Sequence, residues 1–270
     1  MPNKIRFLYI GDVMGSTGLD LIESELPKLK KELELDLVIA QAENVTSGRG
    51  CSPQDFLRLK AAGVDFCTAG NWTLWRKDIF SLLEDPEQPI IRPANYREGA
   101  AGLKYKYLKS PFGKVLFISL LGQTVGRSSK LKLDNPLTAI DQILDAERNI
   151  VKSAAIVNFH GDYSSEKIVI GQYLDGRVSA VIGDHWHVPT ADARVLPKGT
   201  AHITDVGMVG TLNSSLGVKT DIIVKRWRDG LSVSNQLDSD KPWQFNGLIF
   251  EVDPKTGKAL SATSLNRIYE

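Results

Sequence analysis

The chain has 270 residues, of which 42% are hydrophobic and 24% charged, as is usual for a soluble globular protein with a substantial core. A net charge of +1 gives no electrostatic argument for a polyanion partner such as duplex nucleic acid, although a bound metal could still create a local phosphate site. Two cysteines, Cys51 and Cys67, do not suggest a disulfide framework. Without a signal peptide or an apolar run of membrane-spanning length, the protein is expected in the cytoplasm.

Strands and helices are predicted to alternate along most of the sequence. Apolar runs predict strands at 5–10, 37–41, 66–69, 105–108, 115–120, 155–159, 177–182, 200–204, 248–252 and 260–268. Apolar periodicity and capping residues predict helices at 19–33, 53–62, 76–83, 136–152, 165–174 and 220–227. This alternation predicts a layered α/β fold, and the closing strands favour mixed sheets. No linker or repeat divides the chain, so we expect one domain over residues 1–270.

Two of the four histidines stand one residue apart, in the stretch Gly183-Asp184-His185-Trp186-His187. We expect Gly183 and Asp184 to end the preceding strand, so that both imidazoles follow at its carboxyl end, where ligands bind in open α/β sheets. In an extended chain, residues at i and i+2 point the same way. Two neutral imidazoles on one side favour half of a metal site, although chance and surface exposure explain such a pair equally well.

Other predicted strands also end in residues that bind metal ions. The full set of candidate ligands is Asp12, Glu43, Asn44, Asn71, His160, His185 and His187. Oxygen and nitrogen ligands without a thiolate suit manganese, iron or zinc. Seven ligands are too many for one tetrahedral ion and suit two ions about 3.5–4 Å apart with a bridging carboxylate. The alternative is that Asp12 and Asn71 are caps or turn residues and that His160 is a satisfied strand-end histidine.

Several short motifs occur in an order that points to one family. They are Gly11-Asp12-Val13, Glu43-Asn44, Gly70-Asn71, Phe159-His160, Gly183-Asp184-His185-Trp186-His187 and Thr204-Asp205-Val206-Gly207-Met208. Nearly end to end, the sequence resembles the bacterial YmdB-like metallophosphoesterases of the calcineurin-like phosphoesterase superfamily. The resemblance implies a four-layer metallophosphoesterase sandwich, with mixed β-sheets flanked by helices. It also implies a centre of two divalent or mixed-valence metal ions, with iron or manganese most common.

The resemblance divides the candidate ligands between the two ions. The first ion would be held by Asp12, Asn44 and His187, the second by Asn71, His160 and His185, and both by the bridging Glu43. Members of the family are phosphodiesterases of cyclic nucleotides, in 2′,3′-cyclic and 3′,5′-cyclic forms. The implied partner is therefore a cyclic nucleotide or another small phosphodiester, and homo-oligomers occur in the family.

One position departs from the family pattern. The residue after Gly70-Asn71 is a histidine in the family, where it contacts the phosphate and can protonate the leaving oxygen, but here it is Trp72. An indole cannot exchange a proton near neutral pH, and losing a general acid lowers a rate by about 10²–10⁴-fold. No catalytic residue is therefore assigned. Trp72 and Trp186, together with Trp75, are expected to line an aromatic pocket for a base or ribose; the alternative is ordinary packing, which is favoured for Trp75.

Three functions remain open on the sequence alone. The favoured one is a dinuclear metal-dependent phosphodiesterase for cyclic nucleotides, with activity reduced or altered by Trp72. The second is a catalytically impaired sensor or scaffold that binds metal and nucleotide. The third is a phosphatase for monoesters, which the residues do not exclude.

Overall fold

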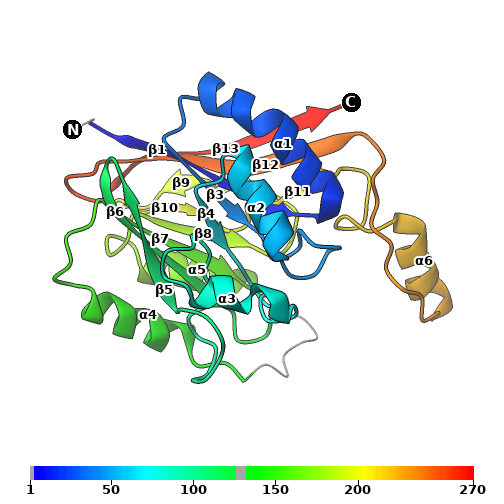
Figure 1. Ribbon diagram of the computed structural model, residues 1–270, viewed down its shortest axis with the longest axis horizontal. Coiled ribbons are helices and arrows are strands. Elements are labelled where there is room, and N and C mark those ends of the chain that lie inside the picture. Colours follow the sequence, from blue (N-terminus) through cyan, green and yellow to red (C-terminus); the bar gives the residue numbers. More distant parts are fainter. Residues whose placement is uncertain (1–2, 126–131) are drawn as a thin grey trace.

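Two mixed β-sheets pack face to face in the computed structural model, which describes residues 3–125 and 132–270 (Figure 1). The seven-stranded sheet has the order β2-β11-β12-β1-β3-β4, with β13 paired to β12. Its strands are β1 (Ile5–Ile10), β2 (Asp12–Val13), β3 (Leu37–Gln41), β4 (Phe66–Thr68), β11 (Met208–Thr211), β12 (Trp243–Val252) and β13 (Ala259–Tyr269). The six-stranded sheet has the order β5-β6-β7-β8-β10-β9. Its strands are β5 (Tyr105–Ser110), β6 (Gly113–Leu121), β7 (Ala154–His160), β8 (Ala180–Asp184), β9 (Arg194–Val195) and β10 (Ala201–Ile203).

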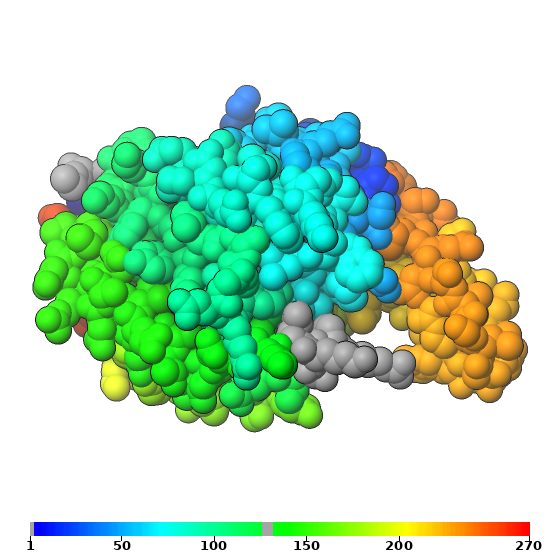
Figure 2. Space-filling model, turned by 60° about the horizontal axis from the view of Figure 1, so that its bottom comes forward, coloured from blue at the N-terminus to red at the C-terminus, as the bar shows by residue number. Residues whose placement is uncertain are grey.

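Helices cover the outer faces of both sheets (Figure 1). The helices α1 (Gly15–Glu32), α2 (Pro53–Ala62) and α3 (Phe80–Glu84) pack on the seven-stranded sheet, and α3 continues the short 3-10 helix η1 (Lys77–Ile79). The helices α4 (Pro136–Ala146) and α5 (Ser164–Tyr173) cover the six-stranded sheet. The four-layer sandwich expected from the resemblance is confirmed. A further helix, α6 (Thr220–Asp229), projects from the body (Figure 2).

Strand β1 shows how the sequence distributes side chains between the layers. Phe7 and Tyr9 belong to the core between the two sheets, whereas Leu8 and Ile10 belong to the core under α1 and α2. This follows from the period of two in a strand, which sends successive side chains to opposite faces. Because both faces are covered, the strand reads as a continuous apolar run, each fully buried side chain contributing about 1.5–3 kcal/mol.

The central strands place the candidate ligands at one edge of the sandwich. Strands β1, β3 and β4 run parallel in one sheet, and β6, β7, β8 and β10 run parallel in the other. Residues at the carboxyl ends of parallel strands meet at the same edge, which is where α/β sheets bind ligands. None of the helices in the described ranges is both long and apolar enough to cross a membrane.

Several predicted element boundaries are wrong, among them those of β8 and α4. Gly183 and Asp184 do not break the strand but are the last two residues of β8, because they pair in register with Phe159 and His160 of β7. Gly183 is suited to this position because a Cβ there would lie only 1.8 Å from the carbonyl oxygen of Thr204. The helix predicted to reach residue 152 ends with α4 at residue 146. The strands β2, β9 and β11 were not predicted, because they are too short to show an alternating pattern.

Candidate metal centre

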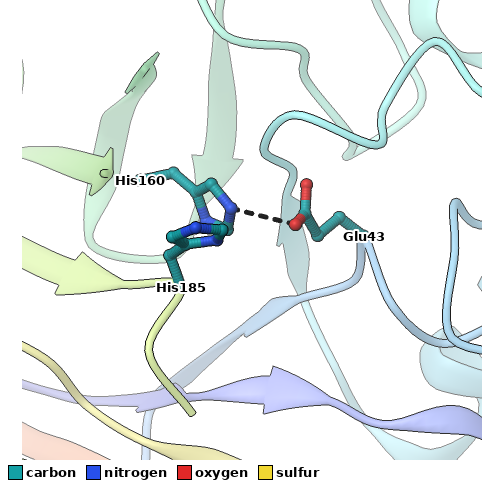
Figure 3. Close-up of side chains that lie close together, drawn as sticks. All are labelled: Glu43, His160 and His185. Atoms are coloured by element: carbon teal, nitrogen blue, oxygen red, sulfur yellow. Dashed lines mark ion pairs between the residues drawn. The ribbon is translucent and has the colours of Figure 1, made fainter. Parts of the chain in front are cut away.

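Glu43, His160 and His185 converge where β3, β7 and β8 end (Figure 3). One ligand atom from each lies within 4.8 Å of the others. The Oε1 atom of Glu43 is 2.9 Å from Nε2 of His160, and the two imidazole centroids are 4.4 Å apart. Asn71, which follows β4, places its Oδ1 atom 3.0 Å from the same Nε2 of His160. A carboxylate, two imidazoles and an amide oxygen form a donor set that suits a transition-metal ion.

Asp12, Asn44 and His187 form a second group of candidate ligands. His187 Nε2 lies 3.7 Å from Asp12 Oδ1, too far for a hydrogen bond. Within the described ranges, Asp12 Oδ1 and Asn44 Oδ1 are buried acceptors without any hydrogen-bond partner. Unsatisfied buried oxygens are rare and destabilising, and a cation held between them would satisfy both. The residues present therefore fit a metal ion on this side of the site.

The protonation state of His187 also suits a metal ligand. Its Nδ1 lies 3.2 Å from the carbonyl oxygen of Leu216, so in the neutral ring Nδ1 carries the proton. Burial lowers the pKa of His187 to about 4, which keeps the imidazole neutral at pH 7. The lone pair on Nε2 then faces Asp12, and a metal ion requires such an unprotonated nitrogen.

The two histidines after β8 do not lie in extended backbone. His185 has φ of 99° and His187 has φ of 62°, both in the left-handed region that favours glycine. The expectation that both rings point the same way from an extended chain is therefore wrong. The unusual backbone turns each ring to a different partner, His185 toward Glu43 and His160, and His187 toward Asp12. Such conformations cost about 1–3 kcal/mol each and persist only where surrounding contacts hold them.

A buried ion pair supplies those contacts. The Nζ atom of Lys167, on α5, donates to Asp205 Oδ2 at 2.5 Å and to the carbonyl oxygen of Asp184 at 2.6 Å. The same carboxylate of Asp205 accepts the backbone N–H groups of Trp186 and Gly207, both at 2.9 Å. The ammonium also lies 4.1 Å from the centre of the Trp186 ring, a cation–π contact. Lys167 and Asp205 thus fix the peptide between the two histidines.

Asp184, which was not among the candidate ligands, holds His160 in place. Its Oδ1 accepts a hydrogen bond from His160 Nδ1 at 2.7 Å. Its Oδ2 accepts from Tyr9 Oη at 2.8 Å, Gln41 Nε2 at 2.9 Å and Asn158 Nδ2 at 2.6 Å. Burial alone raises the pKa of Asp184, but the charge of His160 and these donors outweigh it and hold the pKa below its usual value. The available signal was the pair of polar residues, Gln41 and Asn158, inside otherwise apolar strands.

The centre concentrates negative charge inside the protein. Asp12, Glu43 and Asp184 are at most 1% exposed. Burial, assisted by the charge of Asp184, raises the pKa of Asp12 well above its usual value. Burial also favours neutral His160, but Glu43 and Asp184 outweigh it and raise the pKa of His160 well above its ordinary value. A bound cation would offset this excess of buried negative charge.

Trp72 lies against the centre through its backbone. Its N–H donates to Glu43 Oε2 at 2.9 Å, and its ring makes an edge contact with Trp75 at 5.3 Å between centroids. Trp72 therefore occupies a position beside the carboxylate expected to bridge two ions, with a side chain that cannot deliver a proton.

Trp186 and Asp162 lie on the other side of His185. The indole Nε1 of Trp186 donates to the carbonyl oxygen of Asp162 at 2.9 Å. Asp162 Oδ1 is 2.7 Å from His185 Nε2, so this carboxylate orients the ring. Asp162 stands two residues after His160, and this proximity was the signal in the sequence for its role.

The remaining histidine and both cysteines are buried, as is usual for residues with a structural role. His202, on β10, is buried, and its Nδ1 lies 2.9 Å from the carbonyl oxygen of Val181. Cys51 and Cys67 are free and buried, and burial raises the pKa of Cys67 to about 12. A thiol with such a pKa is a poor metal ligand at neutral pH.

Comparison with known proteins identifies the family of this chain. The family model described as YmdB-like protein matches residues 8–265. The chain is 38% identical over 256 residues to the 2′,3′-cyclic-nucleotide 2′-phosphodiesterase of Bacillus subtilis (strain 168), covering 95% of this chain and 94% of that protein. A crystal structure described as a novel phosphatase from Mycoplasma pneumoniae superimposes with a TM-score of 0.91 at 33% identity, covering 99% of this chain and 95% of that one. A protein of Thermus thermophilus superimposes with a TM-score of 0.88 at 33% identity, covering 98% of this chain and 100% of that one. The chain belongs to the YmdB-like family.

Proposed function

We propose that this chain is a dinuclear metal-dependent phosphodiesterase that hydrolyses cyclic nucleotides of the 2′,3′- or 3′,5′-type. The observation that carries the proposal is the pair of buried, unpartnered oxygens on Asp12 and Asn44 beside the cluster of Glu43, His160 and His185. The seven candidate ligands exceed the six positions of an octahedral ion, whereas two cations that share Glu43 would accommodate all of them.

Each candidate ligand has a role in this proposal. The first ion would be held by Asp12, Asn44 and His187, the second by Asn71, His160 and His185, and both by Glu43. The ions are proposed to be iron or manganese, divalent or of mixed valence, because the donors are oxygen and nitrogen and both cysteines are buried free thiols.

The residues of this chain prepare the centre for phosphate chemistry. When bound, two such ions supply a hydroxide nucleophile at neutral pH and neutralise charge on the phosphoryl group. Asp184 and Asp162 orient the imidazoles of His160 and His185. Asn71 keeps an amide beside His160, and Lys167 with Asp205 holds the peptide that joins the two loop histidines.

The names of similar proteins support the substrate class. The Bacillus subtilis relative is named for action on 2′,3′-cyclic nucleotides, and the Mycoplasma pneumoniae relative as a putative phosphatase/phosphodiesterase, 34% identical over 278 residues. A phosphodiester with a good leaving group needs no general acid, so Trp72 is compatible with turnover of such a substrate. Three further points stay predictions. Substrates with poorer leaving groups are turned over slowly, the protein is located in the cytoplasm, and it assembles into a homo-oligomer.

A second function is favoured by the surroundings of Trp72. The residue retains its backbone contact to Glu43 but offers only an indole where an acid is expected. A protein with this centre and no proton donor would bind metal and nucleotide without efficient turnover, as a sensor or scaffold does.

One assay separates these functions. Protein reconstituted with Mn²⁺ or Fe²⁺ is tested on bis(p-nitrophenyl) phosphate, p-nitrophenyl phosphate, 2′,3′-cyclic AMP and 3′,5′-cyclic AMP. Turnover of the diesters above that of the monoester, lost on chelation, is the expected result. No turnover in the wild type together with activity in Trp72→His would favour the sensor instead, and preference for the monoester would favour a phosphatase.

A further inference from the structure

A cavity of about 390 Å³, large enough for part of a nucleotide, is lined by the loop that follows Glu43 and Asn44. Its lining includes Met14 and Thr46, each two residues beyond a candidate ligand of the first ion. It also includes the guanidinium groups of Arg49 and Arg76 and the indole of Trp75. Hydroxyl, guanidinium and aromatic groups together are suited to a sugar, a phosphate and a base.

Arg49 is the cation in this cavity without a carboxylate partner. Its guanidinium carbon lies 4.8 Å from the ring centre of Trp72 and 5.6 Å from that of Trp75. Arg76, in contrast, pairs with Asp78 at 2.6 Å. Across the residues that the structure describes, no acidic group pairs with Arg49, whose side chain is exposed. A stacked guanidinium keeps the N–H groups on its edge free to bind a phosphate.

The loop that carries Arg49 is closed onto the metal centre. The N–H of Arg49 donates to the carbonyl oxygen of Thr46 at 3.0 Å, and the N–H of Thr46 donates to the carbonyl oxygen of Gly50 at 3.0 Å. The N–H of Gly50 in turn donates to the carbonyl oxygen of Glu43. Arg49 is therefore placed by the same backbone that places Glu43, one aromatic side chain away from it.

This placement bears on which phosphate Arg49 could bind. A free cyclic nucleotide has a single phosphate, and in the proposed function that phosphate lies at the metal ions. Such a substrate has no second anion for Arg49. A substrate with a second phosphate, separated from the first by a nucleoside, would satisfy both the metal ions and Arg49.

We propose that the preferred substrate carries a second phosphate one nucleoside away from the reacting diester, as at the end of a nucleotide chain, and that Arg49 binds this second phosphate. The inference rests on the proposed function and narrows it from free cyclic nucleotides to nucleotide ends. Arg49 is then a specificity-determining residue, which acts on substrate binding and leaves the reacting bonds untouched.

A matched pair of substrates tests the proposal. Adenosine 2′,3′-cyclic phosphate and the same molecule with a 5′-phosphate differ only in the second phosphate. In the Mn²⁺-loaded wild type, the added phosphate is expected to lower KM by about tenfold, the contribution of one charge-assisted hydrogen-bonded contact, with kcat unchanged. In Arg49→Gln the two substrates should have equal KM values. The control Arg194→Gln removes another exposed arginine, paired with Asp192, and should keep the wild-type difference.

Binding to metal-free protein gives a readout independent of turnover. Isothermal titration calorimetry in EDTA should show tighter binding of the 5′-phosphorylated compound, and Arg49→Gln should abolish the difference. Equal KM values for both substrates in the wild type would overturn the proposal while leaving the phosphodiesterase assignment intact. If neither compound is hydrolysed but the binding difference depends on Arg49, the phosphate site stands and the proposed reaction fails. If neither turnover nor an Arg49-dependent binding difference is found, both are overturned.

Discussion

His160 and Asp184 face each other across neighbouring strands, and His160 Nδ1 donates to Asp184 Oδ1 at 2.7 Å. This hydrogen bond fixes which nitrogen of His160 can bind a metal, because Nδ1 is occupied and Nε2 points to Glu43 and Asn71. In the metal-free protein the neighbouring carboxylates raise the pKa of His160, so a proton occupies the place that a metal ion would take.

Replacing Asp184 by asparagine is expected to weaken metal binding by about 10–100-fold, the usual effect of losing a carboxylate that orients a histidine ligand. The amide keeps the shape of the side chain but no longer stabilises the oriented imidazole. Calorimetric titration with Mn²⁺ measures the change. Asp192→Asn is the matched control, because Asp192 accepts hydrogen bonds from Thr190 and Thr204 instead of a histidine. Equal Mn²⁺ affinity in wild type and Asp184→Asn would contradict this role.

Replacing Trp72 by histidine is expected to raise kcat on 3′,5′-cyclic AMP by up to about 10²-fold, because a proton donor then lies beside the leaving oxygen. The rate on bis(p-nitrophenyl) phosphate should change little, since p-nitrophenolate leaves without protonation. Trp75→His controls for an added imidazole at the exposed neighbouring ring. An equal gain on both substrates, or a gain in the control, would show that proton transfer is not what Trp72 lacks.

In the metal-free centre, His187 and His160 are expected to make opposite contributions to stability on the two sides of pH 6.5. The folded-state pKa of His187 is lowered to about 4, so folded protein binds fewer protons than unfolded protein between pH 4 and 6.5, and stability rises there. The folded-state pKa of His160 is raised above 6.5, so its contribution is present below pH 6.5 and is lost as pH rises through the folded pKa.

Thermal unfolding in EDTA from pH 4.5 to 8.5 measures this profile. His160→Gln should flatten the fall above pH 6.5, and excess Mn²⁺ should reverse it, because a metal replaces the proton on His160. A metal-free stability that keeps rising from pH 6.5 to 8.5 would contradict the assignment.

Replacing Lys167 by methionine is expected to destabilise the protein by about 3–5 kcal/mol, because Asp205 would remain as a buried charge without its partner. Lys167 and Asp205 are both at most 1% exposed. Urea unfolding measures the loss, with the exposed Lys198→Met as control. The double variant Lys167→Met with Asp205→Leu should recover part of the stability. A loss in Lys167→Met no larger than in Lys198→Met would contradict the structural role.

Much of the fold was predictable from local patterns. The strands 5–10 and 37–41 are continuous apolar runs, and they coincide with β1 and β3. Ser52 and Gly63 mark the ends of α2 as cap residues do, with the Ser52 side chain accepting from Asp55 N and Gly63 at φ of 104°. These signals act within a few residues, so the sequence carries them directly.

The support of the candidate site was not predictable in the same way. The role of Asp184 was not visible in the sequence, because its four hydrogen-bond donors come from β1, β3 and β7. Only the tertiary fold brings these strands together. The left-handed backbone of His185 and His187 is held by Lys167, on α5, and by Asp205, in the loop between β10 and β11. Likewise, no local sequence pattern indicates the cation–π contacts of Arg49 with Trp72 and Trp75.

Metal content tests the central claim most directly. Protein reconstituted with Mn²⁺ and passed through a desalting column should contain two ions per chain by plasma mass spectrometry. His187→Ala and His185→Ala should each retain about one ion or fewer and lose hydrolysis of bis(p-nitrophenyl) phosphate, whereas His202→Gln, outside the centre, should retain both ions and activity. A single ion in the wild type, or unchanged metal content in both His187→Ala and His185→Ala, would contradict the two-metal phosphodiesterase.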